Sequence, residues 1–388
     1  MNKPIPFSLF TLLLLLMSCQ SNQIVSLESV IEFDHESIIS EADQYLLQAP
    51  VPITQFVAER SEGGIHDFYS EGDYWWPNPE DPDGPYIRRD GESNPDNFTA
   101  HREIMWDLGR WVATLVGAYK VTGDEKYAQH ALTHLKAWFI DPNTLMNPSL
   151  LYAQAIKGRV TGRGIGIIDT IHLIEVARSI QELEKLGFLK GDDLTALKDW
   201  FDQFVTWLNT HQYGIDERDH GNNHSTWWAA QVAVFADLTA RDDYMKVARA
   251  QFKKLLPAQM DSTGGFPEEL SRTKPYNYTL FNLEGYSVLA RIASTEEENL
   301  WAYQGKTGSL SKAFEFMVPF MADKSQWIKA PDVQYFDKLP IQSSGLLFAA
   351  LGTDNSEWME VWESLSPERK AKEIERTYPI RQPILWIE

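Results

Sequence analysis

The segment 265–285 combines side chains that can carry out a proton transfer. It places Arg272, Lys274, Tyr276 and Tyr278 close together, directly ahead of an apolar run. A tyrosine near cations can have its phenol pKa lowered from about 10 towards working pH, and it then becomes a proton-transfer group. We expect this segment to be a loop that leads into a helix. The alternative is a surface loop with core aromatics.

A second segment, residues 221–228, contains Asn223 and His224 at the expected start of another helix. An asparagine before a helix can be a simple cap, and one histidine can be an ordinary polar residue. A metal site is a further alternative, because His220 and His224 are four residues apart. No acidic third ligand follows at a recognisable spacing, so the pattern favours a site without a metal.

Residues 73–95 could bind a ligand through aromatic and cationic side chains. They contain four aromatic residues, five prolines and the pair Arg88 and Arg89. Such a rigid surface can stack on a ring and pair with an anion at once. Arginines in aromatic company, in a chain whose net charge is −20, point to an anionic ligand. The alternative is a proline-rich lid that Trp75 and Trp76 anchor to the helices.

A glycine-containing segment at residues 152–166 offers two more ligand contacts, Gln154 and Arg163. Its glycines are not those of a phosphate-binding loop, because no strand precedes them and no Gly-Lys-Ser/Thr triplet follows. We expect both side chains to contact the same ligand as the other segments.

Helices with one apolar stripe must position these segments. Apolar residues recur at i, i+3/i+4 and i+7 along 102–121, and Gly123-Asp124 separates this stretch from a similar one at 127–139. This pattern predicts an antiparallel helix pair. Further pairs are expected at 167–180 with 194–208 and at 225–240 with 242–256, further helices near 279, 309 and 341, and only short strands, such as 383–387.

The repeated helical hairpins indicate either an α-solenoid or an α/α toroid. The hairpins share no sequence motif, and the loops between them are long and rich in Trp, Tyr, Arg and Asn. This favours a toroid whose loops form a cleft. We therefore predict an all-α fold, an incomplete barrel of about six or seven hairpin pairs, in a single domain over residues 41–388.

The overall composition limits the classes of molecule that the protein can bind. The 388 residues include 35 Lys+Arg against 55 Asp+Glu, so a general nucleic-acid binder is excluded unless a basic patch is concentrated locally. Hydrophobic residues make up 43% of the chain, which is typical of a globular protein. The 14 Trp, 15 Tyr and 19 Phe exceed what a core needs, and many stand in expected loops, where sugar rings are suitable stacking partners.

The amino terminus indicates an exported protein. Residues 7–17 are mostly apolar, too few to span a bilayer and the right length for a secretory signal. The run ends in Leu-Met-Ser-Cys at 16–19, which resembles a bacterial lipobox, so we expect a signal peptide over 1–18, lipidation at Cys19 and a tether over 19–40. Gln20 then favours an outer-membrane lipoprotein, facing the periplasm or the cell surface. The alternative is an ordinary signal peptide with an incidental cysteine.

Together, the segments resemble polysaccharide lyases. Asn223-His224-Ser225-x-Trp227, followed by Tyr278 54 residues after His224 with Arg272 just upstream, is similar to the active-site pattern of alginate lyases of polysaccharide lyase family five. The Tyr-Trp-Trp-Pro-Asn-Pro stretch at 74–79, Ile-Arg-Arg-Asp-Gly-x-Ser-Asn-Pro at 87–95 and the stretch 378–386 look still more like polysaccharide lyase family thirty-eight. The likeness covers residues 60–388. Thr226 departs from family five, which usually has Tyr there.

The resemblance implies an α/α toroid that cleaves a polyuronate by β-elimination without a metal or organic cofactor. It implies that Tyr278 transfers the proton, with Tyr276 as its competitor, and that Asn223 and Arg272 neutralise the substrate carboxylate with help from His224, as base or as neutraliser. The expected substrate-binding residues are Trp227, Tyr276, Lys274, Arg88, Arg89, Trp75, Trp76, Gln154 and Arg163.

The expected substrate is alginate, most simply its mannuronate-containing form, and the expected protein is a monomer. Three alternatives remain open at this point: a glucuronan lyase, a non-catalytic glycan-binding lipoprotein, and a glycoside hydrolase using Glu268 and Glu269. We further expect the cations of the loops to form a positive cleft within an acidic shell.

Overall fold

The computed structural model describes residues 27–369 and 371–387. The expected signal peptide and the lipidation site Cys19 lie outside these residues. Helix α1 (Leu27–Tyr45) runs through the expected end of the tether at residue 40, and Ile38 is buried against the core, so the folded part begins before residue 41. No helix in the described ranges has the length and apolar character needed to cross a membrane.

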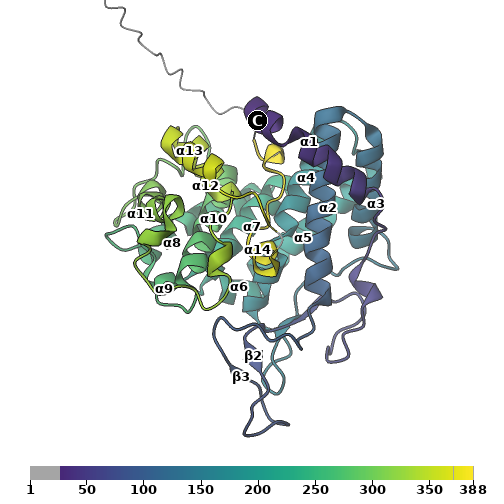
Figure 1. Ribbon diagram of the computed structural model, residues 1–388. Coiled ribbons are helices and arrows are strands. Elements are labelled where there is room, and N and C mark those ends of the chain that lie inside the picture. The colour runs from purple at the N-terminus through teal and green to yellow at the C-terminus, as the bar shows by residue number, and fades with distance from the viewer. Residues whose placement is uncertain (1–26, 370, 388) are drawn as a thin grey trace, which may run out of the picture.

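The body is built from antiparallel helix pairs (Figure 1), as the periodicity predicts. The principal helices are α2 (Ala100–Thr122), α3 (Glu125–Phe139), α4 (Leu173–Lys185), α5 (Gly191–Thr210), α7 (Asn223–Thr239), α8 (Asp242–Gln259), α10 (Pro275–Ala293), α11 (Leu310–Ala322), α12 (Ser344–Thr353) and α13 (Ser356–Ser364). Shorter helices are α6 (Gln212–Arg218), α9 (Pro267–Leu270) and α14 (Lys372–Thr377).

The expected turn between the first pair is present. Gly123 ends α2 with a φ of 70°, a left-handed conformation that glycine adopts without a Cβ clash. Asp124 then caps α3, because its side chain accepts a hydrogen bond from the backbone N–H of Lys126. Residues 123–124 therefore reverse the chain and stack the two helices side by side.

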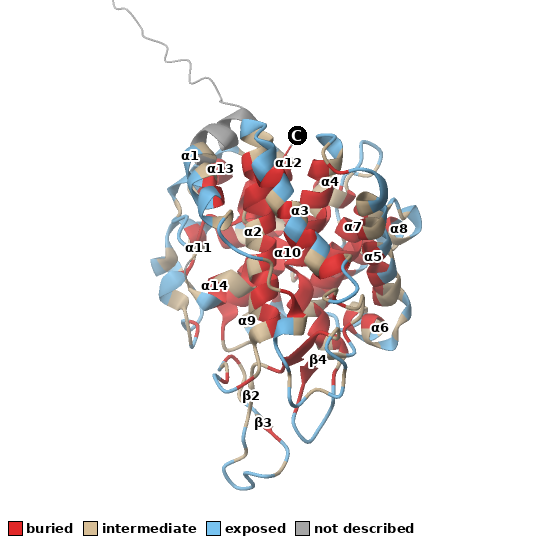
Figure 2. Cartoon of the chain, turned by 90° about the vertical axis from the view of Figure 1, so that its right-hand side faces the viewer, coloured by how far each residue is buried: buried red, intermediate tan, exposed pale blue. Residues whose placement is uncertain are grey.

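Helices α2, α4, α7, α10 and α12 pack in succession as an inner layer, and α3, α5, α8, α11 and α13 lie outside them as their partners. Helix α7 is buried on almost every side. Figure 2 shows that buried residues fill the interior of the helical body. This arrangement is an incomplete α/α toroid, and the predicted fold class is confirmed.

Short strands and loops extend beyond one end of the helical body (Figures 1 and 2). Strand β1 (Tyr69–Glu71) pairs in parallel with β4 (Tyr152–Ala155), and β2 (Trp75–Trp76) pairs antiparallel with β3 (Ile87–Arg88). These strands bring the two ligand-binding candidates, residues 73–95 and 152–166, to the same end of the toroid.

The carboxyl-terminal segment packs back onto the inner helices. The strand expected at 383–387 is wrong, because Pro383–Leu385 forms a 3-10 helix. Glu175 on α4 accepts hydrogen bonds from the backbone N–H groups of Arg381 and Gln382. This anchoring holds α14, directly upstream, beside the loop end of the toroid.

Candidate active site

A cavity of about 360 Å³ opens at the loop end of the toroid, a size suited to a small ligand or a few sugar units. Five arginines and two aspartates line it, an excess of three positive charges before the histidines are counted. They are Arg88, Arg102, Arg163, Arg272 and Arg376, with Asp73 and Asp169. The four expected catalytic residues Asn223, His224, Arg272 and Tyr278 all line this cavity.

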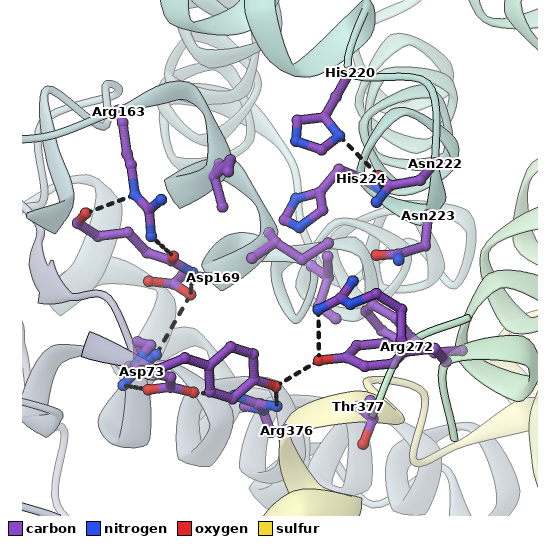
Figure 3. A pocket seen from close by; sticks show the side chains of 18 of the residues that line it. Asp73, Arg163, Asp169, His220, Asn222, Asn223, His224, Arg272, Arg376 and Thr377 are labelled. Carbon is purple, nitrogen blue, oxygen red and sulfur yellow. Dashed lines mark hydrogen bonds and ion pairs between the residues drawn. The ribbon is translucent and has the colours of Figure 1, made fainter. Parts of the chain in front are cut away.

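The start of α7 places two of these side chains. Asn222 is the N-cap, and its side-chain oxygen accepts a hydrogen bond from the backbone N–H of His224 at 3.1 Å. Capping thus falls to Asn222, which leaves the side chains of Asn223 and His224 available at the cavity wall (Figure 3).

A buried carboxylate on α9 orients Asn223. Glu269 accepts two hydrogen bonds from Asn223, one from the backbone N–H and one from Nδ2, both at 2.8 Å. Burial raises the pKa of Glu269, and these hydrogen bonds only partly offset that effect. Since an ionised carboxylate can only accept, Asn223 must turn Nδ2 towards Glu269.

A second buried carboxylate, on α6, orients His224. Glu217 Oε1 lies 2.7 Å from His224 Nδ1, and Glu217 Oε2 has no hydrogen-bond partner among the described residues. Because Nδ1 is held by Glu217, the other ring nitrogen, Nε2, is the one left for a ligand. The neighbouring His220 bonds Asn222 Oδ1 through its Nδ1 at 2.9 Å.

Tyr278, in the first turn of α10, has a hydroxyl at the centre of a hydrogen-bond chain. It lies 2.8 Å from the hydroxyl of Tyr74 and accepts a hydrogen bond from Arg272 Nη2 at 3.1 Å. Burial raises the pKa of Tyr278 well above 10, Tyr74 adds to this effect and Arg272 opposes it. The expected net lowering of this pKa is therefore wrong, because burial outweighs the cation.

Arg272 is itself held in place by a carboxylate. Its Nε and Nη2 donate to the two carboxylate oxygens of Asp90 at 3.1 and 2.9 Å, and its guanidinium lies 4.1 Å from the centre of the Tyr278 ring. Burial works to raise the pKa of Asp90, but Arg272 holds it at about 2. The guanidinium is thus fixed over the phenol on which it acts.

The cavity also includes residues that the sequence analysis did not select. Tyr74 accepts a hydrogen bond from Arg376 Nη2 at 3.1 Å, and Arg376 also pairs with Asp73. Burial works to raise the pKa of Asp73, but Arg102 and Arg376 together lower it to about 2. Tyr74 stands in the aromatic run at 74–79, and Arg376 lies two residues before the stretch 378–386. Both stretches were part of the family resemblance, but nothing in the sequence indicated that these two side chains meet in the cavity.

Gln154 holds Arg163 at the cavity wall. Gln154 has a φ of 49°, a strained backbone conformation for a residue with a side chain. Its backbone and side-chain oxygens accept hydrogen bonds from Arg163 Nε and Nη2 at 3.0 and 2.9 Å. Both residues line the cavity, as do Arg88 and Trp75.

Five expected substrate contacts lie elsewhere. Trp227 and Tyr276 are fully buried, and Trp227 Nε1 donates to the backbone of Phe281 while the Tyr276 hydroxyl donates to that of Phe320. Tyr276 is two residues from Tyr278, about 200° around a helix, so the two rings point in different directions.

Lys274 is fully buried and pairs with Glu373 at 2.7 Å, so it neutralises a protein carboxylate instead of a ligand. Trp76 and Arg89 stack on each other outside the cavity, with the guanidinium 4.8 Å from the ring centre. The positive cleft therefore forms from three of the five expected cations, Arg88, Arg163 and Arg272, with Arg102 and Arg376 in addition.

The pair of carboxylates considered for hydrolysis does not face the cavity. Glu268 is exposed, whereas Glu269 is buried and committed to Asn223. In the described parts of the chain, no three His, Cys, Asp or Glu side chains lie together as a metal-binding group.

The fold and the cavity together define an α/α toroid with a cation-lined cleft. The chain belongs to the alginate lyase family, because the family model described as alginate lyase matches residues 53–327. No curated protein sequence matches the chain.

Solved structures of alginate lyases are similar to this one. An alginate lyase from Bacteroides ovatus is 31% identical, with 91% of this chain and 96% of that chain aligned and a TM-score of 0.80. Alginate lyase A1-III from Sphingomonas species A1 is 16% identical over 91% and 93% of the two chains, with a TM-score of 0.53. A variant of A1-III in complex with a tetrasaccharide is 14% identical over 92% and 95%, with a TM-score of 0.55. The A1-III comparisons show the fold alone.

Proposed function

We propose that the protein is a polysaccharide lyase that cleaves alginate by β-elimination. The observation that carries the proposal is the meeting of Asn223, His224, Arg272 and Tyr278 in one cavity with an excess of positive charge. Family membership and the similar structure of the Bacteroides ovatus alginate lyase support it. The long motifs at 74–79, 87–95 and 378–386 favour polysaccharide lyase family thirty-eight.

Elimination across C5 and C4 of a uronate removes a weakly acidic proton beside a carboxylate. The negative charge of that carboxylate opposes the carbanion that forms, so the site must neutralise it. Asn223, His224 and Arg272 are placed to do so, each held by a carboxylate of the protein at 2.7 to 3.1 Å. A donor aimed at charge that develops in the transition state contributes about 3 kcal/mol.

Tyr278 is the proposed proton carrier. Its proton first leaves towards Tyr74 and solvent, and Arg272 stabilises the phenolate. The phenolate then takes H5, the C4=C5 double bond forms as the C4–O4 bond breaks, and the phenol returns the proton to O4. No water is consumed. Tyr278 ends as the phenolate that took H5, ready for another turnover, and it becomes a phenol again only when solvent returns the proton that it first lost.

Mannuronate suits a single proton carrier. Its H5 and O4 lie on the same face of the ring, whereas guluronate, its C5 epimer, places them on opposite faces. Glucuronate differs from mannuronate at C2 and shares its C4 and C5 configuration, so the same geometry serves a glucuronan lyase. We therefore propose mannuronate-containing alginate as the preferred substrate, with glucuronan as the alternative.

Purified protein incubated with polymannuronate, polyguluronate or glucuronan tests this function. We expect the ultraviolet absorbance of the unsaturated product to rise fastest with polymannuronate. No rise with any polyuronate, together with retention of the polymer, would instead identify a glycan-binding protein. Tyr278→Phe should be folded and inactive, whereas the matched Tyr276→Phe should keep its activity. Near-normal turnover of Tyr278→Phe would remove this residue from the mechanism.

We also propose that acylated Cys19 attaches a monomeric catalytic domain to the outer membrane. The motif at 16–19 supports this anchor. Cys19→Ala expressed in a bacterial host should move the protein from the membrane fraction to the soluble fraction. Equal membrane association of both proteins would contradict the anchor without affecting the proposed activity.

A further inference from the structure

Two loops beside the cavity, residues 72–95 and 152–163, form a projection that we call the arm (Figures 1 and 2). Three of its arginines, Arg89, Arg159 and Arg163, have no carboxylate within ion-pair distance among the described residues. Acidic residues outnumber basic ones by 20 in the whole chain. Arginines that have no carboxylate partner in such an acidic chain are available to bind an external anion.

Each of these arginines lies against a tryptophan. The guanidinium carbons of Arg159 and Arg163 lie 5.0 and 5.9 Å from the centre of the Trp75 ring, and that of Arg89 lies 4.8 Å from the Trp76 ring. Stacking fixes the plane of a guanidinium without using its N–H groups. Tyr86 accepts from Nε of Arg159, and Gln154 accepts from Nε and Nη2 of Arg163, so among the described contacts the remaining N–H groups are left for a carboxylate. The arrangement therefore orders the cations before any ligand arrives.

The two loops are joined into one unit. Arg159 Nε donates to the backbone oxygen of Tyr86 at 2.8 Å, and the Tyr86 N–H donates to the backbone oxygen of Lys157 at 3.2 Å. Lys157 adds a fourth cation, 5.7 Å from the Tyr86 ring centre. Gly158 permits the close approach of the loops, because a Cβ there would lie 3.0 Å from Pro85 Cα.

The arm continues the cavity outwards. Trp75 and Arg163 line the cavity, whereas Arg159, which stacks on the same Trp75 ring, is exposed outside it. The tip of the hairpin carries Glu80, Asp81 and Asp83, all exposed, which repel an anion. Binding is thus confined to the base of the arm, next to the cavity.

We propose that the base of the arm is a binding surface for the polyanionic chain outside the cavity. It holds the carboxylates of uronate units that neighbour the cleaved unit, through Arg159, Arg89 and Lys157. The inference rests on the proposed function for the identity of the ligand. It adds that the protein binds a polymer more tightly than a short oligomer.

The test is affinity electrophoresis in gels that contain polymannuronate, with Tyr278→Phe as the background so that the polymer stays intact. We expect Arg159→Gln to weaken retardation about three- to fivefold, the effect of one exposed charge pair. The matched control is Arg241→Gln, because Arg241 also stacks on an aromatic ring, 4.1 Å from the centre of Tyr244, but pairs with Asp202 and Asp243 far from the arm. It should not change retardation.

In the active background, Arg159→Gln should raise KM for the polymer by a similar factor, leave kcat unchanged and leave KM for a trimer unchanged. Equal retardation of Arg159→Gln and its background, or equal losses in Arg159→Gln and Arg241→Gln, would overturn the inference. A wild-type protein that forms no unsaturated product would refute the proposed function instead, and the gel would still report on the arm.

Discussion

Replacing Glu269 by glutamine tests whether the orientation of the Asn223 amide matters for activity, because Asn223 itself is kept. The substitution keeps the size of the side chain and removes one acceptor from a buried site that receives two hydrogen bonds from Asn223, both at 2.8 Å. A glutamine accepts one of them and presents its own N–H₂ group to the other. Either a donor is left without a partner, or the Asn223 amide turns over to accept from the glutamine.

Both outcomes have a cost that the geometry sets. A buried donor without a partner costs about 1 to 3 kcal/mol of stability. An overturned amide exchanges the positions of Oδ1 and Nδ2, so its N–H donor is no longer where the native site holds it for the substrate carboxylate, which corresponds to a loss of about 10²-fold in rate. We therefore expect Glu269→Gln to lower kcat/KM about 100-fold while the protein stays folded.

The assay is product absorbance on polymannuronate, with circular dichroism to confirm folding. Glu284→Gln is the matched control, since Glu284 is a fully buried carboxyl that accepts one hydrogen bond, from Gly345 at 2.7 Å, and does not line the cavity. It should keep its activity within about threefold. Protonation of Glu269, whose pKa burial raises, acts like the substitution, so the variant should also lose the acid limb of the wild-type pH profile. Activity of Glu269→Gln within twofold of the control would refute the reasoning.

Three further predictions follow from the same contacts. Tyr74→Phe removes the hydroxyl 2.8 Å from that of Tyr278, and we expect steady-state assays to show kcat about 10- to 100-fold lower, with KM less affected. In Glu217→Gln the new side chain can still accept a hydrogen bond from His224 but carries no charge, so kcat should fall about tenfold. An unchanged kcat would contradict the role of Glu217 in positioning His224. Burial raises the pKa of Glu284 from 4.5 to about 7, so the folded state keeps a proton that the unfolded state has lost over this range. Thermal unfolding should therefore show wild type losing stability relative to Glu284→Gln as pH rises from about 4.5 to about 7, by an order of 3 kcal/mol.

Local sequence predicted much of the fold, because helix formation depends on neighbouring residues. The apolar spacing along 102–121 and 127–139 and the intervening Gly123-Asp124 correspond to α2, α3 and their turn. The same reasoning failed at 383–387, where tertiary packing of the carboxyl-terminal segment outweighs the apolar, strand-like composition. Helix α1 spans residue 40, the expected end of the tether, and local sequence did not indicate this helix.

Burial decided which aromatic and cationic residues face the cavity, and burial is a tertiary property. Helix α7 is buried on almost every side, so its sequence did not distinguish Trp227 in the core from a residue in the cleft. Local sequence does not reveal that Lys274 is paired, because its partner Glu373 lies 99 residues away. The phenol pKa of Tyr278 was misjudged for the same reason, because nearby cations are visible in a sequence and desolvation is not.

By itself, the sequence determined the helical hairpins, the acidic charge balance and the residue types of the site, since each depends on short-range order or composition. Only the tertiary structure decided which atoms meet. Tyr74 and Tyr278 are 204 residues apart, and Arg376 reaches Asp73 across 303 residues. No local spacing encodes such contacts, because they arise when the toroid and its carboxyl-terminal segment bring distant loops to one end of the molecule.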